Sequence, residues 1–322
     1  MINDKLWITL SVIVLVAILG GSYMVRESLK GNPWVDKGLF DRGMELPPLW
    51  LYYDNSQVNS RHWLDFGARS SRALNKPFLN LCYETIVRAN GKHYRVEVIG
   101  GIDGLAQRFG EDWLPAKLRG VQGRIANVGP AEKNWIRAAI LAKYGGLWLD
   151  AGTICLREFG ELPKDKIVFF GTDLDETFSG EGGTAVPGMR AVWVSSPNNP
   201  LMVAWEQACR RRLDTAGGGT QIRGDEKWDF VRFFASAKES VAVVPGAELA
   251  RKGKSGRRIQ LEDLLSNGTI PFDVPAEAIY IALPMRDIEL RSQYGWFMRL
   301  SENQIMESDL VVAQLLKYSL SN

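Results

Sequence analysis

The stretch that decides the fold of this chain reads WIRAAILAKYGGLWLD and spans residues 135–150. Apolar residues recur at three- and four-residue spacing over 132–144, and Ala and Leu favour helices, so this segment is predicted to be a helix. Gly145 fits the left-handed position just beyond a helix end. The apolar run 147–149 is too short for a helix and is typical of a central strand, which places Asp150 where that strand leaves the core. In open α/β sheets, ligands bind at that edge.

The composition excludes several classes of protein. With 322 residues and 46% hydrophobic content, the chain can bury a sizeable core, in one large domain or two small ones. Its 39 basic and 37 acidic residues leave a charge of +2, too small for a broad cationic surface, so nucleic acid is not an expected partner. Cys82, Cys155 and Cys209 are widely spaced, which argues against a zinc site or a disulfide framework, although one bridge with one free thiol stays open. With only His62 and His93, a histidine-rich metal site or a histidine-based triad is disfavoured.

The N-terminal region has the character of a membrane anchor. Residues 6–25 carry no charge, and their length matches the roughly 20 residues that cross a bilayer. We therefore predict a tail at 1–5 and a single transmembrane helix at 6–25, with a cleaved signal peptide as the alternative. The flanking positive charges lean slightly towards a single-pass protein with a cytosolic catalytic domain. Residues 26–48 mix Gly, Pro and charges and are predicted to be a stem, followed by one globular domain over 49–322.

Strand and helix patterns alternate through that domain. The predicted strands are 49–53, 93–98, 147–149, 167–170, 191–194 and 278–282. The predicted helices are 61–74, 79–88, 132–144, 201–213, 226–237 and 306–318. This alternation predicts an α/β fold in which helices flank a mainly parallel central sheet.

The run YGGLWLD at 144–150, preceded by Arg137 seven residues before Tyr144, resembles the signature of the DXD-type glycosyltransferases. This group includes fungal initiating mannosyltransferases and bacterial capsular-polysaccharide glycosyltransferases. A weaker likeness extends to 77–98 and 195–200. The resemblance implies a GT-A-like, Rossmann-related fold, a nucleotide-sugar donor, a glycan or glycolipid acceptor, a divalent cation (Mn or Mg) and hexose transfer with retention of configuration.

Asp150 is a predicted catalytic residue and the predicted metal ligand. When a nucleoside diphosphate leaves, negative charge develops on its β-phosphate, and a cation held by a carboxylate at a strand end would offset that charge. The alternative is an aspartate that only begins a turn before Gly152. The signature supplies further candidates for donor binding, which are Asn134, Arg137, Tyr144, Gly145 and Gly146.

Three departures from the family pattern bear on this site. Gly152 stands where the second acidic residue of the DXD motif would be, Asn134 stands where the family frequently has aspartate, and no histidine follows His93. The cation site is therefore predicted to be weak or dispensable. Asn134 and Arg137 share a helix face by their spacing and are expected to bind nucleotide or sugar hydroxyls, with a solvated face as the alternative.

Two further regions hold candidate site residues. Asp173 and Asp175 form a literal D-x-D after a predicted strand, and alternation along an extended segment would turn both to the same side. Both are candidate catalytic residues, and together with Glu181 they are candidates for sugar-hydroxyl contacts, with a solvated acidic loop as the alternative. Trp296, near the C-terminus, is a candidate for stacking on a sugar or base, and a core position is the alternative.

The sequence thus supports two hypotheses of different classes. The first is a membrane-anchored glycosyltransferase that moves a hexose from a nucleotide-diphosphate sugar to a glycan or lipid-linked acceptor. The second is a catalytically silent relative that serves as a glycan-binding or structural membrane protein, which the three departures favour. A phosphate-handling hydrolase is weaker, because no phosphate-cradling glycine motif accompanies the second acidic region.

Overall fold

The computed structural model describes residues 46–53, 76–119, 128–173, 186–187, 189–215, 240–249, 260–270 and 274–321. The chain divides into two units between Glu45 and Leu46, and all of the described residues belong to the second. The predicted membrane span 6–25 and the predicted helices 61–74 and 226–237 lie outside the described residues. Within the described ranges, no helix combines the length and the apolar character that a bilayer crossing requires.

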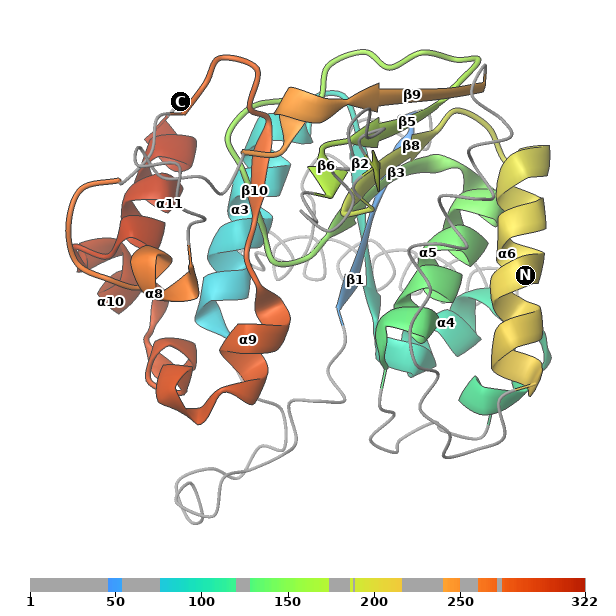
Figure 1. Ribbon diagram of the computed structural model, residues 1–322, viewed down its shortest axis with the longest axis horizontal. Coiled ribbons are helices and arrows are strands. Elements are labelled where there is room, and N and C mark those ends of the chain that lie inside the picture. The colour runs from blue at the N-terminus through green and yellow to red at the C-terminus, as the bar shows by residue number, and fades with distance from the viewer. Residues whose placement is uncertain are drawn as a thin grey trace, which may run out of the picture. The chain divides into compact units, whose positions relative to one another are not determined.

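A six-stranded sheet forms the centre of the described unit (Figure 1). Its strands are β1 (Pro48–Tyr53), β2 (Arg95–Gly100), β3 (Gly146–Asp150), β5 (Ile167–Phe170), β8 (Ala191–Val194) and β9 (Val241–Val244). They lie in the order β2-β1-β3-β8-β5-β9. Strand β8 runs antiparallel to both of its neighbours, and the other adjacent pairs are parallel. The prediction of an α/β fold with a mainly parallel sheet is confirmed, and the single reversal brings the beginning of β8 to the edge where β3 and β5 end.

The central strands β1 and β3 are buried on both faces. Trp50 pairs with Trp148 and Leu51 with Leu149, and all four side chains are buried. A strand covered on both sides has to be apolar at successive positions, which explains why these segments lack the alternation of a half-exposed strand. One position further along, Asp150 pairs with the last buried residue of β1 and is the first polar side chain of β3.

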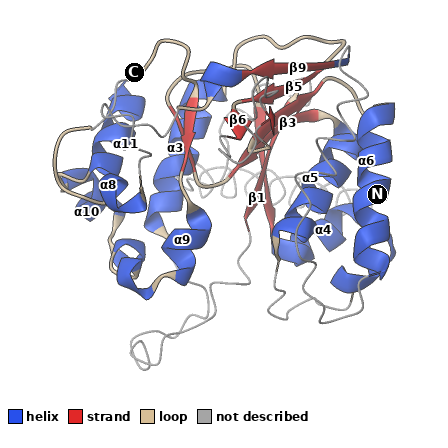
Figure 2. Ribbon diagram, viewed as in Figure 1, coloured by secondary structure: helices blue, strands red, loops and turns tan. Residues whose placement is uncertain are grey.

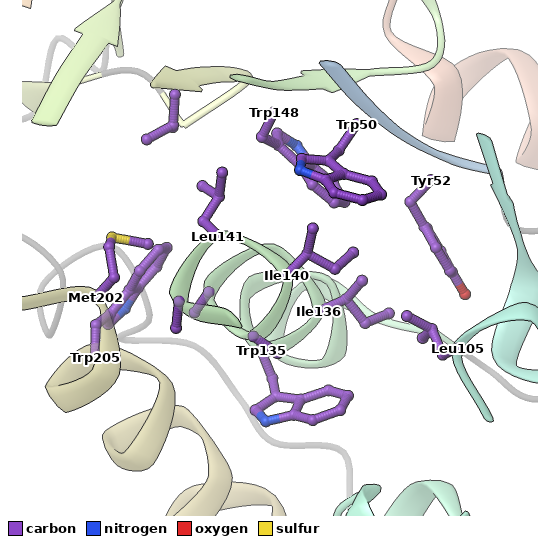
Figure 3. Packing of buried hydrophobic residues seen from close by; sticks show 14 of the residues in the cluster. Trp50, Tyr52, Leu105, Trp135, Ile136, Ile140, Leu141, Trp148, Met202 and Trp205 are labelled. Carbon is purple, nitrogen blue, oxygen red and sulfur yellow. The ribbon is translucent and has the colours of Figure 1, made fainter. Parts of the chain in front are cut away.

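Helices α4 (Gly101–Phe109), α5 (Pro130–Tyr144) and α6 (Pro200–Thr215) cover one face of the sheet (Figure 1). α5 has proline in its first turn, where the missing N–H is harmless, and ends before Gly145, whose φ of 65° favours glycine. Ile136 and Ile140 extend from α5 towards Trp50 and Trp148 of the sheet (Figure 3). Because these side chains are buried together, α5 is fixed against β3 over most of its length.

The opposite face carries α3 (Pro77–Asn90) and α11 (Val311–Ser321), with a small antiparallel pair, β4 (Thr153–Cys155) and β10 (Tyr280–Ala282) (Figure 2). Ile86 of α3 packs with Leu49 and Leu51 of β1 in the core beneath this layer. The remaining elements are the helices α8 (Leu261–Leu264), α9 (Met285–Leu290) and α10 (Glu302–Glu307), and the short antiparallel strands β6 (Thr172–Asp173) and β7 (Val186–Pro187). Within the described ranges there are also five single 3-10 turns, at Glu111–Trp113, Ala116–Leu118, Pro245–Ala247, Ser292–Tyr294 and Phe297–Arg299.

The predicted helix 306–318 is wrong as a single element. The chain instead forms α10 and α11, and the break falls at 308–310. Ser308 has an extended backbone (φ −73°, ψ 160°), and Leu310 forms an antiparallel bridge with Asn267. Serine and aspartate compete with the helix for backbone hydrogen bonds, so a Ser-Asp step is a natural place for the helix to end. The apolar spacing belonged to two successive helices.

Candidate active site

Asp150 ends β3 with its carboxylate partly exposed and firmly held. Trp148 donates its indole N–H to Asp150 Oδ1 at 3.0 Å, and Arg137 Nη2 lies 3.4 Å from the same oxygen. The Asp150 side chain is 39% exposed, whereas that of Arg137 is 6% exposed. Within the described part of the chain, both of these contacts go to Oδ1. A carboxylate that is held through one oxygen and is partly exposed suits the binding of a cation or a hydroxyl.

Arg137 reaches Asp150 from α5. It donates from Nη1 to Asn134 Oδ1 at 3.0 Å, and its guanidinium lies over the Trp148 ring at 5.3 Å from the centroid. Asn134 and Arg137 therefore share a helix face, as their spacing predicts, and that face is turned to Asp150. Burial lowers the pKa of the Arg137 guanidinium, and the negative charge of Asp150 opposes that shift. Arg137 is nearly enclosed by protein, so its geometry is that of a residue that orients Asp150.

Tyr144, Gly145 and Gly146 lie at the other end of β3. Gly146 begins that strand and Asp150 ends it, a separation of about 13 Å for extended chain. The Tyr144 ring packs on Trp50 at 5.2 Å, and Trp50 Nε1 donates to the Gly145 carbonyl at 2.8 Å. These contacts close the turn from α5 into β3. The structure does not bring the three residues together with Asp150.

The two glycines of that turn meet different neighbours. A Cβ on Gly146 would lie 2.3 Å from the Pro48 carbonyl oxygen, and Gly146 has a φ of 93°. A Cβ on Gly145 would lie 2.9 Å from the Ser196 carbonyl carbon. Both glycines thus allow β3 to approach neighbouring backbone closely, which accounts for them without a ligand.

The other predicted site residues fall in three places. Asp173 is in β6, which pairs with β7, and nothing beyond its backbone is described; Asp175 and Glu181 lie outside the described residues. Trp296 is 43% exposed and lines a hollow of about 430 Å³ beside α8 and α10. The residues lining that hollow do not include Asp150 or its partners.

Arg190 and Glu248 are candidate site residues that the sequence did not single out. Arg190 immediately precedes β8, and its carbonyl accepts the backbone N–H of Asp150 at 3.0 Å. Its guanidinium is ion-paired with Glu248. Glu248 in turn lies 3.5 Å from the hydroxyl of Tyr280, which donates to the Phe170 carbonyl at the end of β5 at 2.6 Å. The sequence does show a basic residue, Arg190, directly before the apolar run 191–194. It can be placed beside Asp150 only once β8 is known to run antiparallel to β3.

Helix α9 forms a wall of the same edge. A Cβ on Gly152 would lie 2.5 Å from both Cγ and Sδ of Met285, the first residue of α9. Glu289 of the same helix is ion-paired with the buried Lys76, whose Nζ lies 5.6 Å from the ring centroid of Tyr53 at the end of β1. The place of the second DXD carboxylate is therefore filled by a methionine side chain.

The donor set for a metal ion is small within the part of the chain that the structure describes. Those residues contain no cluster of three or more His, Cys, Asp or Glu side chains suited to a metal. Asp150 fits one ligand position because its carboxylate is partly exposed, whereas Glu248 is engaged by Arg190. Asp150 is thus the residue that would anchor a cation bound at this edge.

No protein family and no curated protein matches this chain. Among solved structures, it is similar to PaToxG glycosyltransferase, at 12% identity and a TM-score of 0.32 over 70% of this chain and 80% of that one. It is also similar to the glycosyltransferase GlyE of Streptococcus pneumoniae TIGR4, at 10% identity in both structures, with TM-scores of 0.38 for the apo form and 0.33 for the other. Both matches cover 86% of this chain and span 63% of GlyE. Likeness at this level assigns neither a family nor an activity to the chain.

Proposed function

We propose that this protein is a glycosyltransferase that takes a hexose from a nucleotide-diphosphate sugar. The observation that carries the proposal is the placement of Asp150, the last residue of the YGGLWLD run, at the carboxyl edge of a mainly parallel sheet, with one carboxylate oxygen held and the side chain partly exposed. Ligands of open α/β sheets bind at that edge. Helices on both faces and one reversed strand also suit the GT-A-like fold that the motif implies.

The proposed transfer requires that the reacting groups are oriented and that the charge of the departing diphosphate is compensated. The arrangement around Asp150 supports both requirements. Arg137 and Trp148 both hold one oxygen of the carboxylate, so Asp150 meets a substrate with little reorganisation. A Mn or Mg ion held by Asp150 would supply positive charge to the departing diphosphate. A single carboxylate binds such an ion weakly, which favours an activity that depends only partly on the metal.

The finer parts of the proposal follow from the sequence. They are transfer with retention, a glycan or glycolipid acceptor, attachment to a membrane through residues 6–25 and a catalytic domain on the cytosolic side. Asp173, Asp175 and Trp296 belong to this part of the proposal as acceptor or donor contacts. The near balance of charge leaves nucleic acid outside it.

A donor screen tests the proposal directly. The melting temperature of the full-length chain, purified in detergent, is measured with UDP-, GDP- and CMP-sugars, each with Mn and with EDTA. A ligand at 100 times its Kd stabilises the folded state by about 2.7 kcal/mol, which is several degrees in Tm. We expect one nucleotide-diphosphate sugar to raise the Tm and to be consumed by transfer or slow hydrolysis.

The matched variants are Asp150→Asn and Asp165→Asn. Asp165 is exposed in the loop before β5, at the opposite edge of the sheet from Asp150. We expect Asp150→Asn to lose turnover of the donor and Asp165→Asn to keep it. Unchanged turnover in Asp150→Asn overturns the role of this carboxylate.

The alternative is a glycan-binding protein without transfer activity, which the methionine packed against Gly152 favours. In that case oligosaccharides raise the Tm of the wild-type chain and no nucleotide sugar does.

A further inference from the structure

Among the residues that the structure describes, two arginines lie beside Asp150, and they differ in what their side chains can reach. The Arg137 side chain is 6% exposed and lies between Asn134, Trp148 and Asp150. The Arg190 side chain is 35% exposed at the beginning of β8. A guanidinium that is almost enclosed orients its neighbours, whereas one that is one-third exposed can also meet a ligand. Of these two cations, Arg190 is therefore the one placed to contact a substrate at the edge of the sheet.

The fold fixes the backbone of Arg190 beside Asp150. Leu149 of β3 pairs with Ala191 of the antiparallel β8, so the next position brings Asp150 against Arg190. The Asp150 N–H donates to the Arg190 carbonyl at 3.0 Å, which continues the ladder by one bond. A cation and a carboxylate are thus held on adjacent strands at the place where both leave the core.

The side chain of Arg190 is positioned by a buried relay. Arg190 is ion-paired with Glu248, which is 10% exposed, and Glu248 lies 3.5 Å from the fully buried hydroxyl of Tyr280. Gly171 makes room for this carboxylate, because a Cβ there would lie 2.7 Å from Glu248 Cβ, and its φ of 94° also requires glycine. Burial raises the pKa of Tyr280 well above its ordinary value, and the charge of Glu248 adds to that effect, so the phenol stays a neutral donor to Phe170.

The chemistry of this arrangement matches a diphosphate. A guanidinium presents five N–H donors in a planar fork, so an arginine engaged by a carboxylate on one side can still donate to phosphate oxygens on another. A nucleotide-sugar donor brings at least two negative charges to an edge where Asp150 alone would repel it. A positive group next to Asp150 offsets that repulsion.

We propose that Arg190, held by Glu248, binds the diphosphate of the nucleotide-sugar donor and shares the compensation of its charge with any cation at Asp150. This inference rests on the proposed function and adds the residue that recognises the phosphates. It also accounts for a site with only one described carboxylate available to a metal, because part of the positive charge is built into the chain.

The test is calorimetric titration of the full-length chain with UDP, GDP, UMP and GMP, in EDTA and in Mn. The variants are Arg190→Gln and Arg190→Lys, with Arg108→Gln as the matched control. Arg108 is 32% exposed and ion-paired with Glu97, and its carbonyl lies near the Tyr144 hydroxyl, towards the beginning of β3. It thus offers a similar Arg–Glu pair away from Asp150.

We expect Arg190→Gln to bind the preferred nucleoside diphosphate 10- to 100-fold more weakly in EDTA and to keep its affinity for the monophosphate. Arg190→Lys should recover part of the loss, since it keeps the charge without the fork. Arg108→Gln should bind as the wild type does. If wild type and Arg190→Gln bind the diphosphate with equal affinity, this inference alone is overturned. It is also overturned if Arg190→Gln loses the same factor of affinity for mono- and diphosphate, because such a loss indicates a structural role. A wild-type chain that binds neither UDP nor GDP overturns the proposed function itself, and this inference with it.

Discussion

Gly146→Ala separates a structural role of the YGGLWLD glycines from a role in ligand binding. A Cβ at this position meets the Pro48 carbonyl oxygen at 2.3 Å and Pro48 Cγ at 2.8 Å. Because the first of these atoms is backbone of the paired strand β1, the clash is relieved only if β1 and β3 move apart. The residue also has a φ of 93°, which alanine adopts at a cost.

The matched control is Gly110→Ala. Gly110 has a φ of 89°, and a Cβ there meets nothing within 4 Å, so this variant carries the backbone strain without the clash. We expect the control to lose about 1–3 kcal/mol from strain. Gly146→Ala should lose a further amount of about 1–3 kcal/mol from overpacking. At roughly 2–4 °C per kcal/mol, the second variant melts about 2–12 °C below the control.

The assay is thermal unfolding of the full-length variants followed by tryptophan fluorescence, with nucleotide affinity measured well below both melting temperatures. The structural role predicts a lower Tm for Gly146→Ala and wild-type affinity for the nucleotide at low temperature. If Gly146→Ala melts together with Gly110→Ala but has lost nucleotide binding, the packing argument is refuted and the glycine belongs to the ligand site.

Two more predictions follow from buried groups. Burial raises the pKa of the Cys155 thiol to about 12 and that of Cys82 still further, from an ordinary value of 9.0, so the folded chain holds these protons where the unfolded chain releases them. The free energy of unfolding therefore keeps its full value below about pH 9 and falls as the pH rises, by up to about 1.4 kcal/mol per pH unit for each thiol. The double variant Cys82→Ala/Cys155→Ala should flatten the slope of the unfolding free energy between about pH 9 and 11. An unchanged slope contradicts the assignment. Gly152→Asp should displace Met285, which costs about 1–3 kcal/mol of unfolding free energy and lowers the Tm. Adding Met285→Ala should relieve the overpacking. If the single variant is as stable as the wild type, the space beside Gly152 was open.

The sequence predicted those parts of the fold that local pattern controls. Helix spacing, the two glycines and a short apolar run were sufficient for α5 and β3, and Asp150 was placed at the sheet edge because a strand that is apolar throughout becomes polar only where it leaves the core. Asn134 and Arg137 were placed on one helix face by their spacing, and the structure joins them by a hydrogen bond. Each of these inferences uses neighbours within a few turns of chain.

The sequence could not predict contacts that depend on strand direction. The run 191–194 reads as a strand in either orientation, and only its reversal sets Arg190 beside Asp150. The sequence also did not indicate that Glu248, 58 residues further along the chain, pairs with that arginine. Tyr144 was grouped with Asp150 because both belong to one motif. That motif runs along β3, so its first and last residues lie at opposite ends of the strand.

The reversed strand therefore changes what the candidate site can do. Were β8 parallel to β3, its first residue would lie at the opposite edge, and of the two arginines discussed above Asp150 would keep only the enclosed Arg137 beside it. Antiparallel pairing instead places the Arg190 carbonyl on the Asp150 N–H, so the partly exposed side chain of Arg190, paired with Glu248, begins at the same end of the sheet. The carboxylate that suits a cation and the guanidinium that suits a phosphate are then set by the same pair of strands. Any shift of β8 that weakens diphosphate binding should therefore also disturb Asp150. We expect diphosphate binding by Arg190 and cation binding by Asp150 to be lost together when the β3–β8 register is broken. Each should be lost separately when only its own side chain is changed.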